Sequence, residues 1–197
     1  MATRTDVRVV SRALTMIGAN PITSFIDGSA EANVATEIYE DLVQEELSMY
    51  PWSFAKEQEV LGQLVAEPVD EWTYAYQLPN TTLTVLRVTV NGNPIEYERF
   101  GDKVFCDELE NVVATYIFRA IEPTWTPYFT SLVVHKLAAV FATAIAERPR
   151  LAQAIYAELE AVRMMARNRD SSSQTTRRIR TSRFRRVRNS DRTDVYT

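Results

Sequence analysis

The chain has 197 residues, of which 46% are hydrophobic, so it can form one domain of ordinary size or two small ones and is not disordered over most of its length. The single cysteine, Cys106, excludes an intramolecular disulfide framework and predicts a reducing compartment, and a single histidine, His135, leaves too few ligands for a structural zinc site. No segment has the pattern of a signal peptide or the length of a membrane span, so we expect neither.

Charge is distributed unevenly along the chain. Residues 1–147 contain 9 Lys and Arg against 21 Asp and Glu, a balance of −12, whereas residues 148–197 contain 13 Arg against 5 acids, a balance of +8. The sequence therefore predicts an acidic body with a basic C-terminal region. That region contains no lysine, which favours planar, bidentate contacts with carboxylates or phosphates over diffuse screening.

Two helices are predicted near the start of the chain. Apolar residues spaced by three and four over residues 5–17 predict the first, and Gly18 can close it in the left-handed conformation. The second begins after a serine N-cap, Ser29, and ends before Pro51. Because the connection between them is short, we expect the two helices to lie side by side and roughly antiparallel.

A period of two replaces the helical period in the middle of the chain. Alternation over residues 82–90 predicts a strand, and Asn91-Gly92 is the strongest hairpin signal, because both residues tolerate positive φ. Further strands are expected at residues 95–100, 103–106 and 111–119, with a turn at Gly101-Asp102 and an edge strand carrying Trp72, Tyr74 and Tyr76. These strands predict one small, mainly antiparallel sheet inserted between two helical segments.

Helical character returns at Thr126-Pro127, where the threonine can cap a helix and the proline suits its first position. An alanine-rich apolar run to about residue 147 predicts a buried helix, and a fourth helix is expected from Pro149 to about Arg167. The packing signal is lost beyond Asn168. We expect the arginine-rich end to be disordered alone and ordered only against a partner, because it has too few apolar residues for a core.

The order of several motifs resembles one protein family. A helix ending in Ile17-Gly18, a turn with Pro21 and Asp27-Gly28, a long helix and the run PWSF at residues 51–54 are similar to the N-terminal half of tail tubular protein A. That family forms the head-to-tail adaptor of short-tailed bacteriophages. The run DEWTYAYQLP at residues 70–79 continues the resemblance, which covers about the first 170 residues and fades in the arginine-rich end.

The predicted elements and this resemblance imply an α+β fold. It would be an antiparallel bundle of four helices with an inserted small antiparallel β-sheet and an extended C-terminal arm. The expected divisions are 1–55 for the first half of the bundle, 56–122 for the β-rich insert, 123–169 for the second half and 170–197 for the basic arm.

The resemblance also implies a structural virion protein without enzymatic activity or cofactor. Copies would form a ring, expected to contain twelve, between the portal protein and a tail nozzle similar to tail tubular protein B, with the tail fibre as a further neighbour. Double-stranded DNA would pass through the channel without specific binding, and no membrane is involved. The protein would be assembled in the host cytoplasm and reside in the tail or neck of the virion.

Three sets of residues are candidates for these contacts. The portal-binding arm comprises Arg177, Arg178, Ile179, Arg180, Arg183, Phe184, Arg185, Arg186, Val187 and Arg188. The candidate channel-facing acids are Glu37, Glu40, Asp41 and Glu45, and the nozzle-facing residues of the insert are Asn91, Gly92, Asn93, Gly101 and Asp102.

Each charged set also has a simpler interpretation. Acids on a helix are usually its solvated face, whereas in a ring they would repel phosphates and let a duplex slide. The arginines alone indicate nucleic acid, so the alternative hypothesis is a basic-tailed nucleic-acid-binding protein. The interleaved Ile179, Phe184 and Val187 favour instead an arm that wraps an acidic protein surface and can add a strand to a neighbour's sheet. An adaptor of long-tailed phages would share the helices but lack the inserted sheet.

No residue pattern supports an enzyme. His135 lies in the middle of an apolar helix and is expected to be a packed or interface residue, and Cys106 is expected to be a buried strand cysteine. No glycine-rich phosphate motif occurs. The acids of residues 102–110 lack the spacing of an EF-hand, so a solvated turn is the better interpretation.

Overall fold

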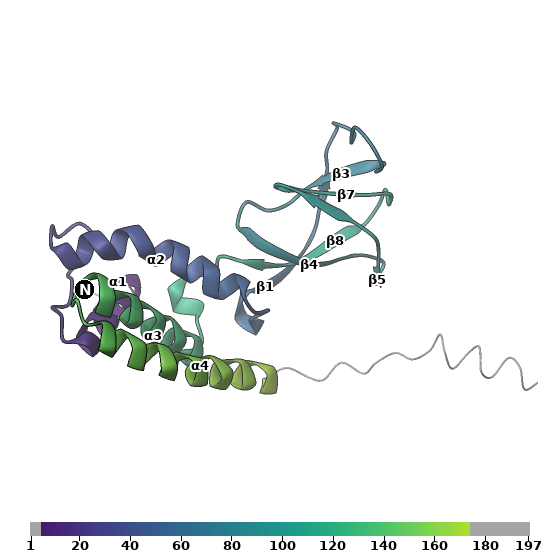
Figure 1. Ribbon diagram of the computed structural model, residues 1–197. Helices are drawn as coiled ribbons and strands as arrows, with labels where there is room; N and C mark the ends of the chain where they lie inside the picture. Colours follow the sequence, from purple (N-terminus) through teal and green to yellow (C-terminus); the bar gives the residue numbers. More distant parts are fainter. Residues whose placement is uncertain (1–4, 174–197) are drawn as a thin grey trace, which may run out of the picture.

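The computed structural model describes residues 5–173, which form four α-helices and two four-stranded antiparallel sheets (Figure 1). The predicted α+β class is therefore confirmed. The helices come from both ends of this range and pack together, while the strands form a domain that projects from one end of the helices. The predicted arm at residues 177–188 lies outside the described residues.

The helical elements lie close to their predicted positions. The helices are α1 (Thr5–Ile17), α2 (Ala30–Ser48), α3 (Pro127–Ala144) and α4 (Pro149–Ser172), with short 3-10 helices η1 (Ser53–Ala55) and η2 (Glu122–Thr124). Gly18 closes α1 with a φ of +77°, and the Ser29 hydroxyl accepts a hydrogen bond from the Ala32 amide at 3.1 Å. Both predicted caps are confirmed.

The start of α3 differs from its prediction in one detail. Thr126 has the extended backbone of an N-cap residue, but its side chain makes no capping hydrogen bond, and its buried hydroxyl has no partner among the described residues. Thr126 therefore occupies the predicted N-cap position, but its side chain does not cap the helix. Pro127 at the first helical position removes one donor, so fewer free amides remain to be capped.

The helices share one core, centred on α3. This helix buries residues on most of its sides and packs against α1, α2 and α4, with Phe129, Leu132, Leu137 and Phe141 inaccessible to solvent. The main neighbour of α1 is α3 rather than α2. The short connection between α1 and α2 thus did not identify the main partner of α1, because an apolar helix from the second half of the chain supplies the surface that the α1 stripe needs.

The β domain contains two sheets instead of the single sheet predicted. Sheet A has the order β1 (Lys56–Val60), β8 (Val112–Phe118), β4 (Thr82–Val90), β5 (Asn93–Pro94), and sheet B has the order β2 (Gly62–Gln63), β3 (Tyr74–Gln77), β7 (Lys103–Cys106), β6 (Glu98–Phe100). Their inner faces bury a second core that includes Tyr76, Val104 and Tyr116. Phe118 packs against both cores and so links the two regions.

Several strand predictions are confirmed and others are corrected. Residues 82–90 and 103–106 are strands within the predicted bounds, and the predicted turn has φ values of +49° at Asn91 and +80° at Gly92. The expected return strand is divided, because β5 pairs with β4 in sheet A while β6 pairs with β7 in sheet B. The predicted edge strand around Tyr76 is instead internal to sheet B, because it pairs with both β2 and β7.

Candidate interaction surfaces

The side chains that could take part in catalysis, those of His135 and Cys106, pack against neighbouring residues. No three His, Cys, Asp or Glu side chains come together to hold a metal ion within residues 5–173. His135 is half-buried in α3, with Nδ1 2.7 Å from the Ser131 carbonyl oxygen, and Cys106 is buried in β7. Burial raises the pKa of the Cys106 thiol, which keeps it in the protonated, unreactive form. No helix in this range is long and apolar enough to cross a membrane.

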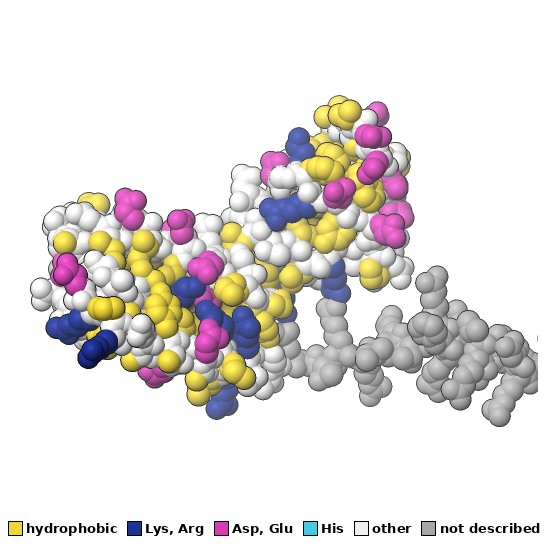
Figure 2. Space-filling model, viewed as in Figure 1, with side chains coloured by type: hydrophobic (Ala, Val, Ile, Leu, Met, Phe, Trp, Pro, Cys, Tyr) yellow, Lys and Arg dark blue, Asp and Glu magenta, His cyan; other side chains and the backbone are white. Residues whose placement is uncertain are grey.

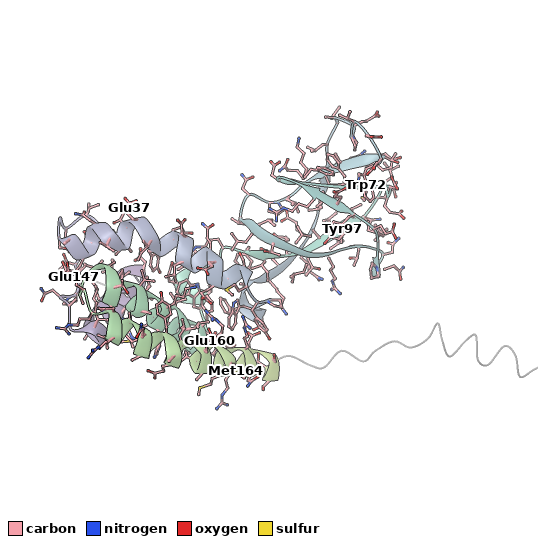
Figure 3. The ribbon with its side chains drawn as sticks, in the orientation of Figure 1. Glu37, Trp72, Tyr97, Glu147, Glu160 and Met164 are labelled. Atoms are coloured by element: carbon pink, nitrogen blue, oxygen red, sulfur yellow. The ribbon has the colours of Figure 1, made fainter. Side chains whose placement is uncertain are left out.

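The four candidate channel-facing acids of α2 have different environments. Glu37 projects outward from α2, away from the other helices (Figure 3), and Asp41 is also exposed. Glu40 pairs with Arg119 at 2.7 Å, and Glu45 pairs with Lys136 at 2.9 Å. Two of the four carboxylates are thus held by cations of the same chain, which leaves Glu37 and Asp41 as the acids available to an external charge.

A fifth acid of α2, Glu46, is buried between three helices. Its side chain is 1% exposed, and its Oε1 lies 3.0 Å from Lys136 Nζ and 2.8 Å from Arg163 Nη2. Burial lowers the pKa of Lys136, but hydrogen bonds to Glu45 and Glu46 outweigh that effect and raise the pKa above its ordinary value. The carboxylate therefore connects α2 to α3 and α4 through these two contacts.

The sequence contained a signal for this cluster that the prediction missed. Glu46 follows Leu42 by four residues and so lies on the apolar stripe of α2 rather than on its solvated face. Lys136 lies in the most apolar helix, where a cation requires a buried partner. An acid and a base that both fall on apolar stripes predict a buried ion pair between the two helices.

A second buried carboxylate, Asp170, lies near the end of α4. It accepts hydrogen bonds from the Ser53 hydroxyl at 2.6 Å, from the Ser53 amide at 3.1 Å and from the Tyr128 hydroxyl at 3.0 Å. The Tyr50 hydroxyl lies 2.6 Å from Ser171 Oγ. α4 continues to Ser172, beyond the predicted end at Arg167. These contacts hold its last turn beside the connection that leads into β1.

Arg119, which follows β8, links residues at the junction between the helices and the β domain. Its guanidinium forms two hydrogen bonds with Glu40, at 2.7 and 2.8 Å, and a third with Glu122 at 2.7 Å. It also lies over the ring of Trp125, 5.7 Å from the centroid. Burial lowers the pKa of Arg119, but the two carboxylates more than offset this. A planar, bidentate cation suits this geometry, since the single ammonium of a lysine cannot place two parallel N–H groups against one carboxylate.

The five candidate nozzle-facing residues lie at the tips of two turns. Asn91 and Gly92 connect β4 to β5, and Asn93 is the first residue of β5, whereas Gly101 and Asp102 connect β6 to β7, so the two sets belong to different sheets. All five are exposed. A hydrogen bond from Gln77 lowers the pKa of Asp102, and this carboxylate stays charged at any pH near neutrality.

Comparison with protein-family models finds no match, and comparison with curated proteins finds none either. The case for a function therefore depends on the charges, contacts and exposed surfaces of the described residues, together with the motif order of the sequence.

Proposed function

We propose that the protein is a structural, non-enzymatic head-to-tail adaptor of a short-tailed bacteriophage. Copies form a ring, of twelve by resemblance, between the portal and a tail nozzle, and the ring surrounds the DNA channel. The four helices act as an antiparallel bundle that forms the body of each subunit. The basic residues 177–188 bind the portal, and the turns of the β domain meet the nozzle.

One observation carries this proposal: the described residues form two regions, each with its own core. The helical core includes residues of α1, α2, α3 and α4, whereas the β domain has its own core and projects from the helices (Figure 1). An adaptor needs such a division, because it must contact one assembly through each part. The basic segment follows the last turn of α4, which Asp170 holds beside Ser53.

The charges of α2 support the channel part of the proposal. Glu37 and Asp41 are exposed and lie four residues apart, so they share one face of the helix. In a ring that turns this face inward, the repeated carboxylates would repel the phosphate backbone and let DNA pass without adhering. Glu40 and Glu45 are paired within the subunit and contribute less to that field.

Electron microscopy of negatively stained particles tests the proposal. The purified protein, alone and mixed with portal particles, is expected to form rings that attach coaxially to the portal. A variant lacking residues 174–197 keeps α4 intact and is expected to lose portal attachment. A protein that stays monomeric and never joins the portal would refute the adaptor.

The arginine-rich end favours one alternative, a nucleic-acid-binding protein. In that case the same deletion would abolish tight duplex binding, and the binding of the full chain would weaken steeply with salt. A filter-binding assay from about 50 to about 200 mM salt, with both proteins, separates the two hypotheses. The adaptor predicts weak duplex binding by the assembled ring and retention of the portal contact by the full chain.

A further inference from the structure

The outer face of sheet B carries two neighbouring aromatic residues among the polar side chains of Gln77, Glu98 and Lys103. Phe100 on β6 and Phe105 on β7 lie on this face with ring centroids 4.7 Å apart, and Phe100 is 46% exposed. An antiparallel sheet with one solvated face normally carries polar side chains there. Two neighbouring aromatic rings on such a face indicate a surface that a partner covers.

The connection between β2 and β3 converts this face into a groove. Residues 64–73 form a wall along the sheet, and the Trp72 indole donates a hydrogen bond to Glu98 at 3.3 Å. Trp72, Phe100 and Phe105 line a cavity of about 490 Å³ together with Val69, which is fully exposed. This volume lies within the range of about 300 to 1,000 Å³ that is usual for binding sites.

Acidic residues surround the apolar floor of the groove. Glu67, Asp70 and Glu71 belong to the lining, and Lys103 is the one cation among the described lining residues. Figure 2 shows hydrophobic side chains on the β domain with acidic ones along one side. Glu71 has a φ of +61°, a conformation that costs a non-glycine residue energy and often occurs at binding sites. The groove therefore suits a segment that combines apolar side chains with positive charge.

We propose that this groove, the sheet B groove, binds residues 177–188 of a second copy of the chain. That segment contains seven arginines and three apolar residues, Ile179, Phe184 and Val187. Phe184 fits the aromatic floor, and the arginines beside it pair with the carboxylates of the rim, with the bidentate geometry that guanidinium groups provide. The groove and the segment are complementary in both charge and apolar character.

The second copy is favoured by where the segment starts. The last turn of α4 is held beside Ser53 by Asp170 and beside Tyr50 by Ser171, at the end of the β domain that adjoins the helices. The wall that connects β2 to β3 lies at the opposite end of the β domain (Figure 1). A neighbouring subunit can supply the segment to this distant groove. Within one chain, an alternative site is the exposed edge of β1.

This inference builds on the ring of the proposed function, but it assigns the basic segment a second binding site. The groove of a neighbour and the portal then compete for residues 177–188, so subunits that are not attached to a portal exchange their segments. If the groove does not bind the segment, the proposed portal contact is unaffected.

Photo-crosslinking of the full chain tests the assignment. Phe184 is replaced by p-benzoylphenylalanine, equal amounts of ¹⁴N and ¹⁵N protein are mixed and irradiated, and the crosslinked peptides are identified by mass spectrometry. We expect mixed-isotope peptides that join position 184 to residues 64–73 or 98–105. Crosslinks within single chains, crosslinks to residues 56–60, or the absence of crosslinks would each overturn the proposal.

Two variants show whether the groove itself is responsible. W72A and F100A are each expected to lower the yield of mixed-isotope crosslinks about tenfold, since aromatic anchors dominate such contacts. Val60→Ala, an exposed apolar residue on β1 outside the groove, is the matched control and should leave the yield unchanged. An unchanged yield in W72A and F100A would refute the site.

Portal attachment is scored separately, and W72A is expected to attach as well as the wild type. If neither the wild type nor the variants attach to the portal, the adaptor is refuted instead.

Discussion

The helical body and the β domain differ in whether they bury charged side chains. Among the described residues, the buried charged side chains, Glu46 and Asp170, both belong to the helical body, whereas the buried polar residues of the β domain are Thr89 and Thr115. A buried carboxylate is costly unless its partners are placed accurately, so each one restricts how the helices can pack. The β domain has no such restriction and instead leaves aromatic side chains on its outer face. The comparison suggests a body built for a fixed shape and a domain built for contact.

The largest expected effect is a difference in stability between two Phe-to-Ala substitutions, one in each region. Phe129 is fully buried on α3, against Trp52 and Trp125, whereas Phe100 is half-exposed on β6. We expect Phe129→Ala to lower the free energy of unfolding by about 3 to 5 kcal/mol and Phe100→Ala to lower it by less than about 1 kcal/mol. Chemical denaturation of both variants gives the two values. Equal losses would mean that the outer face of sheet B is part of a core.

The second prediction concerns the buried carboxylate that fixes the end of α4. Asp170→Asn removes the charge that strengthens hydrogen bonds from Ser53 and Tyr128, and we expect a loss of about 2 kcal/mol. Asp41→Asn, at an exposed site of α2, is the matched control and should change stability by less than about 0.5 kcal/mol. Native-state hydrogen exchange should show faster exchange of the Ser53 amide in Asp170→Asn alone. Unchanged protection of that amide would contradict the proposed role of Asp170.

The contrast between the regions also explains which elements the sequence could predict. Helices α1, α2 and α3 were predictable because their apolar spacing and their glycine or proline boundaries are local signals. Strands β4 and β7 and the Asn91-Gly92 turn were predictable for the same reason. Strands β1 and β2 carry exposed, mainly polar side chains, and only pairing with β8 and β3 makes them strands. Long-range pairing of this kind has no local pattern.

The candidate surfaces were predictable only in part. The acids of α2 could be named from the helical period, but which of them are paired depended on Arg119 and Lys136, which lie 79 and 91 residues away in the chain. The sheet B groove could not be predicted, because it joins residues 64–73 to Phe100 and Phe105 through the arrangement of sheet B. Residues 177–188 lie outside the described structure, and their role stays a proposal.

The third prediction compares two glycines of the β domain, one with a positive φ and one without. Gly92 has a φ of +80°, and Gly62, on β2, does not have a positive φ. A Cβ added to either residue would meet no atom within 4 Å, so backbone conformation alone distinguishes them. Gly92→Ala is expected to cost about 1 to 2 kcal/mol, whereas Gly62→Ala should be neutral or slightly stabilising. Thermal unfolding of the two variants measures the difference, and equal midpoints would show that the turn does not need a left-handed residue.

The smallest expected effect lies at the junction of the two regions and depends on pH. The hydrogen bond from Arg119 lowers the pKa of Glu40 below its ordinary value of 4.5, against the opposing effect of burial. Because the folded state holds the charged form more strongly, this contribution to stability is complete above pH 4.5 and is lost as the pH falls through the lower, folded pKa. Glu40→Gln should therefore be less stable than the wild type by about 0.5 kcal/mol at neutral pH, since the pair is partly exposed, and should approach the wild type once the pH is below the lowered pKa of Glu40. Glu37→Gln, on the same helix but exposed and pointing outward, should follow the wild type at both pH values. Urea denaturation of the three proteins at both pH values makes the comparison, and a Glu40→Gln difference that persists at low pH would show that shape rather than charge joins the body to the β domain.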